Sequence, residues 1–281
     1  MGPDKDSDPV TKQVWVETHP YLQSIAAFHA QVEVALDGIT IPKAPIPRWD
    51  HYTSDFRIGV PLLRSPRAGI DIRPAGTVVT SLIEALASGP LPDLALGEEV
   101  RSLAAELRGK QDAPSRAVIW LIHEDEFVTA RSGLLRYLGW TVLARFLSPV
   151  VTSFGSWRDE EQWMRSYCPT CGSLPAMAQL VGSDPGRLRL LCCGCCGTRW
   201  RYRRMACPFC ENQDGHRLAV LCVEGEKELR IDYCEHCAGY LKTYNGEGRE
   251  SVLLKDWTSL HLDIIARDRG LKRLAASLYQ L

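Results

Sequence analysis

The chain has 281 residues, of which 45% are hydrophobic and 24% charged, a composition typical of a folded globular protein rather than a disordered one. Its 33 basic side chains nearly balance its 34 acidic ones, so no bulk charge draws the molecule toward nucleic acid or an anionic membrane. The N-terminus lacks the apolar segment of a signal peptide, and no stretch reaches the roughly 18 apolar residues of a membrane span. We therefore expect a cytoplasmic protein, long enough for two domains.

Amphipathic helices are predicted along the first half of the chain. Apolar residues recur at helical spacing in residues 22–36, 79–86 and 96–107, which predicts three helices with one buried face each. The first should end at Gly38 and the second at Gly89, because glycine and a following proline are stop signals.

Three further segments complete the predicted elements. Six prolines between residues 40 and 76 predict an extended segment lying over the helices. Residues 115–147 are apolar and predict one or two buried helices that Pro149 closes. Near the C-terminus, Asp256 is expected to cap a helix that carries the apolar residues of 257–265.

All eleven cysteines lie between Cys168 and Cys237, and eight of them form four Cys-x-x-Cys pairs. The first two pairs are 21 residues apart and the last two are 23 apart, which is typical of zinc ribbons. Two such pairs on a hairpin supply the four soft ligands that tetrahedral zinc or rubredoxin-type iron requires, so two metal ions are predicted. A disulfide framework fits less well, because it needs an oxidising compartment. The predicted ligands are Cys168, Cys171, Cys193, Cys196, Cys207, Cys210, Cys234 and Cys237.

An internal repeat indicates how these pairs combine. The first and third pairs are offset by 39 residues and the second and fourth by 41, so the two halves share one plan. Tandem pairing would join the pairs within 168–196 around one ion and those within 207–237 around the other. Cross-brace pairing, first pair with third and second with fourth, is the alternative that spacing leaves open.

The run CCGCC offers two registers for the second pair, Cys192 with Cys195 or Cys193 with Cys196. Such a turn favours glycine after its second cysteine, where a positive φ lets backbone N–H groups point at the sulfurs. Gly197 follows Cys196 in this way, so the second register is predicted.

The remaining cysteines, Cys192, Cys195 and Cys222, are predicted to be buried free thiols. A site closed by four thiolates has no open coordination position, so it neither activates water nor binds substrate. The two metal sites are therefore predicted to be structural.

No complete catalytic motif is present in the sequence. A zincin-like start at His123 fails because Phe127 stands where the second histidine is needed. The HEDE cluster at 123–126 is interpreted as a solvated helix face rather than a set of acid and base groups. We therefore predict that the protein is not an enzyme.

Cations and aromatic rings alternate at Arg199, Trp200, Arg201 and Tyr202, which makes this run the predicted partner-binding strand. The same pattern is found where single-stranded nucleic acid is bound. Residues 168–244 nevertheless hold ten basic and eight acidic side chains, without the concentrated positive patch that nucleic acid requires.

The segments CPTCGSLP, RLRLLCCGCCGTRWRYRRMACPFC and LRIDYCEHCAGYLKTY, in this order behind a cysteine-free region, resemble the formate dehydrogenase accessory protein (FdhE) family. The resemblance implies a cytoplasmic assembly factor that binds the catalytic subunit of a respiratory formate dehydrogenase and is needed for its activity. It also implies rubredoxin-like iron or zinc on the eight predicted cysteine ligands.

The predicted fold class is therefore α+β. A helical domain at 1–160 precedes two tandem rubredoxin-like or zinc-ribbon modules at 161–205 and 206–250, and a short helical tail occupies 251–281. The predicted function is chaperone-like maturation of a formate dehydrogenase catalytic subunit. A nucleic-acid-binding zinc-ribbon protein and a rubredoxin-like electron-transfer protein are the alternatives.

Overall fold

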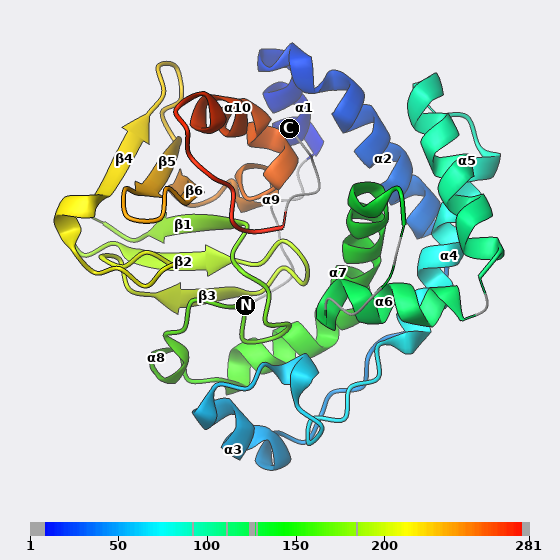
Figure 1. Ribbon diagram of the computed structural model, residues 1–281, viewed down its shortest axis with the longest axis horizontal. Coiled ribbons are helices and arrows are strands. Elements are labelled where there is room, and N and C mark those ends of the chain that lie inside the picture. Colours follow the sequence, from blue (N-terminus) through cyan, green and yellow to red (C-terminus); the bar gives the residue numbers. More distant parts are fainter. Residues whose placement is uncertain are drawn as a thin grey trace.

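The computed structural model describes residues 9–276 except 92, 111, 124–126, 128 and 184. The sheet lies on one side of the molecule and most helices on the other, with the long helix α7 running between them (Figure 1). In the described part of the chain, no helix combines the length and hydropathy needed to span a membrane. This arrangement confirms the predicted α+β fold class, with a helical N-terminal part, a cysteine-rich sheet region and a C-terminal helix.

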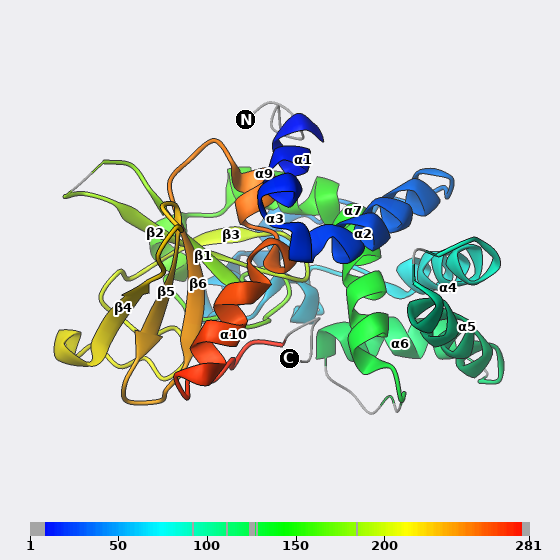
Figure 2. The same ribbon diagram turned by 90° about the horizontal axis from the view of Figure 1, so that it is seen from above.

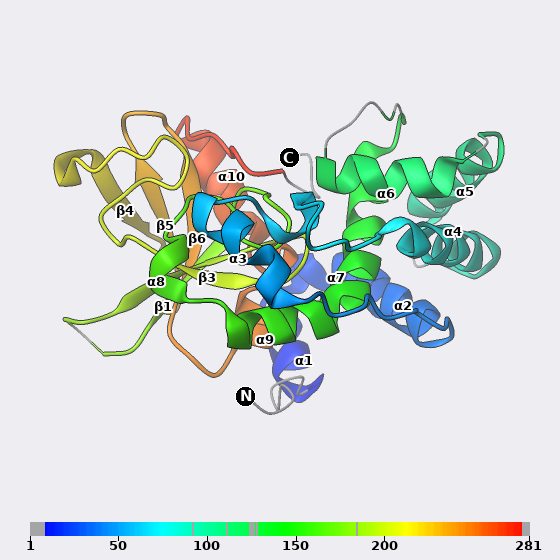
Figure 3. The same ribbon diagram turned by 90° about the horizontal axis from the view of Figure 1, so that it is seen from below.

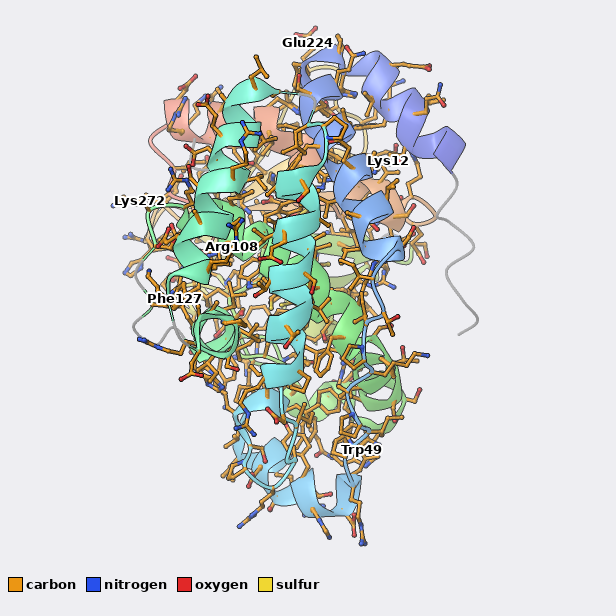
Figure 4. All side chains as sticks on the ribbon, turned by 90° about the vertical axis from the view of Figure 1, so that its right-hand side faces the viewer. Lys12, Trp49, Arg108, Phe127, Glu224 and Lys272 are labelled. Carbon is orange, nitrogen blue, oxygen red and sulfur yellow. The ribbon has the colours of Figure 1, made fainter. Side chains whose placement is uncertain are left out.

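The helical part is built from amphipathic helices whose apolar faces meet around α7. Figure 4 looks onto this end of the molecule, with Lys12 near its top and Trp49 near its base. The three predicted stripes form α2, α4 and α5, and the apolar stretch after them forms α6 and α7. The bounds are α1 Pro9–Thr18, α2 Gln23–Asp37, α3 Trp49–Ile58, α4 Arg73–Ser88, α5 Leu94–Arg108, α6 Ala113–His123, α7 Ser132–Trp157 and α8 Glu160–Trp163, with short 3₁₀ turns η1 at Pro20–Leu22 and η2 at Leu62–Arg64.

The prediction that Pro149 closes the apolar helix is wrong. Helix α7 continues through this proline to Trp157, although proline removes a hydrogen bond from a helix interior. The last turns are held by aromatic packing, since the rings of Phe154 and Trp157 stack on Trp49 with centroids 5.5 and 5.3 Å away. Tertiary packing therefore outweighs the local stop signal.

The proline-rich segment is also not extended throughout. Helix α3 occupies Trp49–Ile58, which lies in the proline-free interval between Pro47 and Pro61, and it ends at Gly59 with φ 86°. The segment after it touches the cysteine-rich region, because the backbone N–H groups of Leu62 and Leu63 donate to the carbonyls of Pro169 and Thr170 at 2.9 and 2.8 Å. It therefore helps to fix the first Cys-Pro-x-Cys turn.

The described strands form one mixed sheet of six strands in the order β3-β2-β1-β6-β5-β4. Each ribbon supplies an antiparallel three-stranded half, and the halves join where β1 pairs with β6 in parallel. The two modules are therefore fused through continuous backbone hydrogen bonding. The strands are β1 Met177–Val181, β2 Leu188–Cys192, β3 Arg199–Tyr202, β4 Leu218–Cys222, β5 Leu229–Cys234 and β6 Tyr240–Asn245. A 3₁₀ turn, η3 Gly215–Arg217, precedes β4. After the sheet come α9 Glu250–Leu253, the 3₁₀ turn η4 Asp256–Ser259 and α10 Leu260–Asp268.

The two faces of the sheet belong to different hydrophobic cores. Leu191, Trp200 and Leu241 on one face join the core of the helical part. On the other face, strands β5 and β6 pack against the C-terminal helices, as Figure 2 shows for α10. Trp15 of α1 belongs to this second core, so the start and the end of the chain are packed together over the sheet.

A buried ion-pair network ties the C-terminal segment to β6. Lys242 is 1% exposed and its Nζ lies 2.8 Å from Asp256 Oδ1 and 2.6 Å from Asp263 Oδ2, and Arg273 contacts both carboxylates. Burial would raise the pKa of Asp256, but the charges of Lys242 and Arg273 outweigh it and lower that pKa to about 2. The prediction that Asp256 caps a helix is thus wrong, because its carboxylate is engaged by these cations instead.

Replacing Lys242 by Met should lower the free energy of unfolding by about 3–5 kcal/mol, because it leaves two buried carboxylates with one cation. Urea unfolding at neutral pH measures the loss. Lys272→Met, at the exposed position directly before Arg273, is the control and should change stability by less than about 0.5 kcal/mol. Equal stabilities for the two variants would contradict the role of the network.

Candidate metal centres

All four Cys-x-x-Cys turns share one backbone geometry. In each, the N–H of the first cysteine donates to the carbonyl five residues later, at 2.9 Å for Cys168, 2.9 Å for Cys193, 2.8 Å for Cys207 and 3.0 Å for Cys234. Further N–H groups point at sulfur, such as that of Gly239 at 3.3 Å from Cys237 Sγ. These backbone hydrogen bonds therefore help to orient the thiols of each turn.

The structure brings the eight predicted ligands into two groups, in the tandem pairing. In the first group, Cys168 Sγ lies 3.5 Å from Cys196 Sγ and Cys171 Sγ lies 3.4 Å from Cys193 Sγ. In the second group, the corresponding distances are 3.7 Å between Cys207 and Cys237 and 3.8 Å between Cys210 and Cys234.

These distances suit a tetrahedral ion. A tetrahedron with metal–sulfur bonds of about 2.3 Å has edges of about 3.8 Å, and within each group all four sulfurs lie within 4.8 Å of one another. Four soft donors without an oxygen or nitrogen ligand match zinc or iron rather than calcium or magnesium. The two clusters can therefore each hold one metal ion, with all four positions filled by the protein.

The electrostatics of the first cluster also favour a cation. Burial raises the pKa of Cys168, whereas hydrogen bonds from Cys168 and Cys193 lower the pKa of Cys171. Four thiolates at this separation repel one another in a water-free site, so full ionisation requires the charge of a metal ion. Hydroxyl groups complete the surroundings, with Thr198 Oγ1 at 3.1 Å from Cys196 Sγ.

The two clusters differ in exposure. The first is buried on all four cysteines and belongs to the helical core. In the second, Cys210 and Cys237 are partly exposed. An ion in the second cluster would therefore be the more accessible to chelators and partners.

The register chosen by the glycine criterion is the one that brings four sulfurs together, but the criterion itself is too narrow. Gly172 and Gly197 have φ 83° and 73°, and the equivalent positions in the second ribbon, Glu211 and Ala238, have φ 57° and 56°. The turn therefore needs a left-handed conformation, which non-glycine residues here also adopt at a conformational cost.

The three remaining cysteines lie in different surroundings. Cys192 and Cys195 are buried, as predicted, and burial raises the pKa of Cys192 to about 12. Cys195 lies beside the first cluster, where its thiol contacts Cys171. The prediction of a buried thiol is wrong for Cys222, which is exposed at the end of β4, because no strand of the described residues pairs with the outer edge of β4.

The predicted partner-binding run lies on β3, at one edge of the sheet. Trp200 and Tyr202 are 0% and 5% exposed and pack into the helical core, so neither ring offers a free face for stacking. Arg199 and Arg201 lie on the other face, where Arg199 donates to Gln179 Oε1 at 2.8 Å and Arg201 pairs with Glu161.

A groove of about 610 Å³ lies beside the first cluster, and the sequence did not predict it. Its walls come from α1, α2 and α7, from the second turn of the first ribbon, and from the segment before α10. Figure 3 shows α7 lying between the sheet on one side and helices α4 and α5 on the other. Its lining includes Lys12, His29, Trp140, Ala144, Cys192, Cys195, Arg199, Lys255 and Trp257.

The groove combines aromatic walls with charged rims. His29 stacks on Trp257 at 4.9 Å and contacts the Tyr137 hydroxyl at 2.8 Å. Burial, with the nearby cation Lys12, lowers the pKa of His29 to about 3, so the imidazole is neutral at pH 7. Aromatic rings with cations at the rim are what a protein-binding cleft offers.

Comparisons with known proteins agree with this construction. FdhE homologs from Aquifex aeolicus, Pseudomonas aeruginosa and Citrobacter koseri are 29, 37 and 28% identical over 46, 39 and 62% of this chain and 47, 38 and 62% of their own lengths. The matched regions thus span less than two thirds of these relatives. No known protein-family profile matches the chain.

The fold resembles a solved structure over almost all of the chain. The crystal structure of the FdhE protein from Pseudomonas aeruginosa superimposes with a TM-score of 0.61 and 22% identity, covering 94% of this chain and 90% of that one. Sequence matches and fold together confirm the predicted resemblance to the FdhE family.

Cys196→Ser should reduce the metal content from two ions per chain to one, because a hydroxyl is a poor replacement for a thiolate ligand. Cys195→Ser is the matched control, because it changes the second cysteine of the alternative Cys192/Cys195 pair, and it should keep two ions. Elemental analysis of purified protein measures both and also decides between iron and zinc. Loss of an ion in the control alone would contradict the register.

Proposed function

We propose that this protein is a maturation factor that binds the catalytic subunit of a respiratory formate dehydrogenase in the cytoplasm. It acts without turnover, as a binding scaffold. The observation that carries the proposal is the likeness to the FdhE proteins in both sequence and fold, together with two clusters in which every metal position is filled by cysteine. A closed tetrathiolate site stiffens a fold and leaves no position for a substrate.

The groove beside the first cluster is the proposed docking site for the catalytic subunit. It brings together three parts of the chain, and its floor includes the turn that carries Cys193 and Cys196. Because that turn is ordered by its thiol contacts, an ion in the first cluster would hold the groove in shape. The metal would therefore support binding without contacting the partner.

The predicted partner-binding residues keep a place in this proposal. Arg199 lines the groove and Arg201 lies on the same strand at the sheet edge. The buried Trp200 and Tyr202 contribute by fixing that strand against the helical core. Arginine pairs well with carboxylates of a partner surface.

Ala144→Trp should abolish co-purification with the catalytic subunit, because an indole on α7 fills part of the groove. Val34→Trp is the control, since Val34 is 74% exposed on α2 and does not line the groove. Affinity capture from cells that express both proteins measures the effect. Full capture by Ala144→Trp, with unchanged stability, would refute the docking site.

The double variant Arg199→Ala/Arg201→Ala should weaken capture of the catalytic subunit by about tenfold or more, since it removes two charge-assisted contacts. Arg203→Ala, which changes an exposed arginine just after β3, serves as its control. Binding constants at two salt concentrations separate the charge contribution, which falls as salt rises. An unchanged dissociation constant would show that these two arginines do not contribute to binding of the catalytic subunit. The groove proposal would remain in place.

A further inference from the structure

The duplicated ribbons use equivalent strands in different ways. By its place after the first cysteine pair, β4 in the second ribbon is the equivalent of β1 in the first. The outer edge of β1 is occupied, because β6 pairs with it in parallel. The same edge of β4 has no neighbouring strand in the described part of the chain, and β4 lies at the outside of the molecule (Figure 1).

The free edge presents unpaired backbone groups. The N–H of Glu235 donates to the carbonyl of Arg217 at 2.9 Å. Together with the register of the β4–β5 hairpin, this bond identifies the residues of β4 that are hydrogen-bonded to β5. Every second residue of β4 then turns its N–H and C=O away from β5. Val220 and Cys222 are these residues, and Val220 is 49% exposed.

The opposite edge of the sheet is blocked. On β3 the Arg201 N–H donates to Glu160 Oε2 at 3.2 Å, and the Arg199 carbonyl accepts from the Arg158 guanidinium. Side chains around α8 thus occupy two of the outward backbone groups of β3, which is a common way to protect a sheet edge. Of the two edges, β4 is the one open to strand addition.

A pocket of about 240 Å³ lies beside β4, and three arginines line it. Arg230 is paired with Asp232 at 2.9 Å, and the second oxygen of that carboxylate accepts from Thr243. Arg189 makes no ion pair within 4 Å among the described residues, although the charge of Asp232 in the same lining acts on it. It is 6% exposed, its Nη1 donates to the Ala206 carbonyl at 3.0 Å, and its Nε has no hydrogen-bond partner there.

A second arginine without a paired carboxylate, Arg204, lines the same pocket. Arg204 is exposed and makes no ion pair among the described residues. A buried guanidinium without a carboxylate is costly, and a carboxylate entering the pocket would satisfy both cations. Apolar side chains surround them, with Met205 58% exposed and Leu218 and Phe209 also lining the space.

We propose that β4 and this pocket form a binding site for an extended, acidic segment of a protein partner. The segment adds a strand to the free edge and places one Asp or Glu side chain against Arg189 and Arg204. A second copy of this chain is the less suitable occupant, because symmetric pairing of two β4 strands would bring two sets of arginines together. The site is separate from the groove and does not depend on the proposed function.

The test uses two fluorescein-labelled peptides of sequence TVTVEVTVT and TVTVQVTVT. Fluorescence anisotropy should show the Glu peptide binding at least about tenfold more tightly than the Gln peptide. Arg204→Gln should remove most of that difference. Arg203→Gln, which changes the exposed neighbour outside the pocket, should preserve it. Equal binding of the two peptides would overturn the proposal.

Strand addition is tested separately from charge. Val220→Pro removes an outward N–H without touching the hydrogen bonds to β5, so it should abolish binding of the Glu peptide. A Glu peptide N-methylated at alternate residues tests the same bond on intact protein and should also fail to bind. Binding by the methylated peptide would overturn the strand model. Hydrogen exchange of residues 218–222 should slow when the Glu peptide binds.

The outcomes separate this site from the groove. Ala144→Trp should leave peptide affinity unchanged, so failure of the formate dehydrogenase proposal leaves this one standing. Sedimentation of the unliganded protein tests the other occupant. A dimer that Val220→Pro dissociates would show that a second copy occupies the edge and would overturn the choice of an acidic partner.

Discussion

The clustering of four thiols within each ribbon is the constraint on which this structure depends. The hairpins that bear these thiols are short, with strands of four to six residues, and such hairpins have little stability by themselves. Sulfur atoms 3.4–3.8 Å apart have the spacing of four ligands around one tetrahedral metal ion. The binding energy of a structural zinc, about 10–16 kcal/mol, is of the size needed to hold such a ribbon together.

The two ribbons are copies in plan but not in their surroundings. The first is embedded in the helical core, where the proline-rich segment hydrogen-bonds to its first turn. The second packs against the helices at the two ends of the chain and leaves part of its cluster exposed. The parallel contact between β1 and β6 makes one sheet of both. The two ribbons are therefore joined by continuous backbone hydrogen bonds.

This arrangement places the metal centres behind the surfaces that a partner would meet. The turn carrying Cys193 forms part of the groove, and Cys207 and Cys234 line the smaller pocket beside β4. In both places the cysteines set the position of backbone, while neighbouring arginines and aromatic rings are available for contacts. Rigid placement of such groups lowers the entropy lost on binding. Under the proposed function, metal ions in the two clusters would suit this use, because four-cysteine sites would order the chain without reacting.

The cysteine spacing, the repeat and the glycine after Cys196 predicted the eight thiols of the two clusters and favoured tandem pairing, because two thiol pairs on one hairpin have few ways to meet. Only the structure chose tandem over cross-brace pairing. Apolar periodicity likewise determined α2, α4 and α5. Only the tertiary structure decided that α7 passes through Pro149, that Asp256 pairs with Lys242, and that Cys222 is exposed. The first two depend on contacts between different elements, and the third on the place of β4 at the edge of the sheet. Local sequence patterns do not reveal such tertiary arrangements. At these positions the free energy of tertiary packing exceeds the conformational preference of the local sequence.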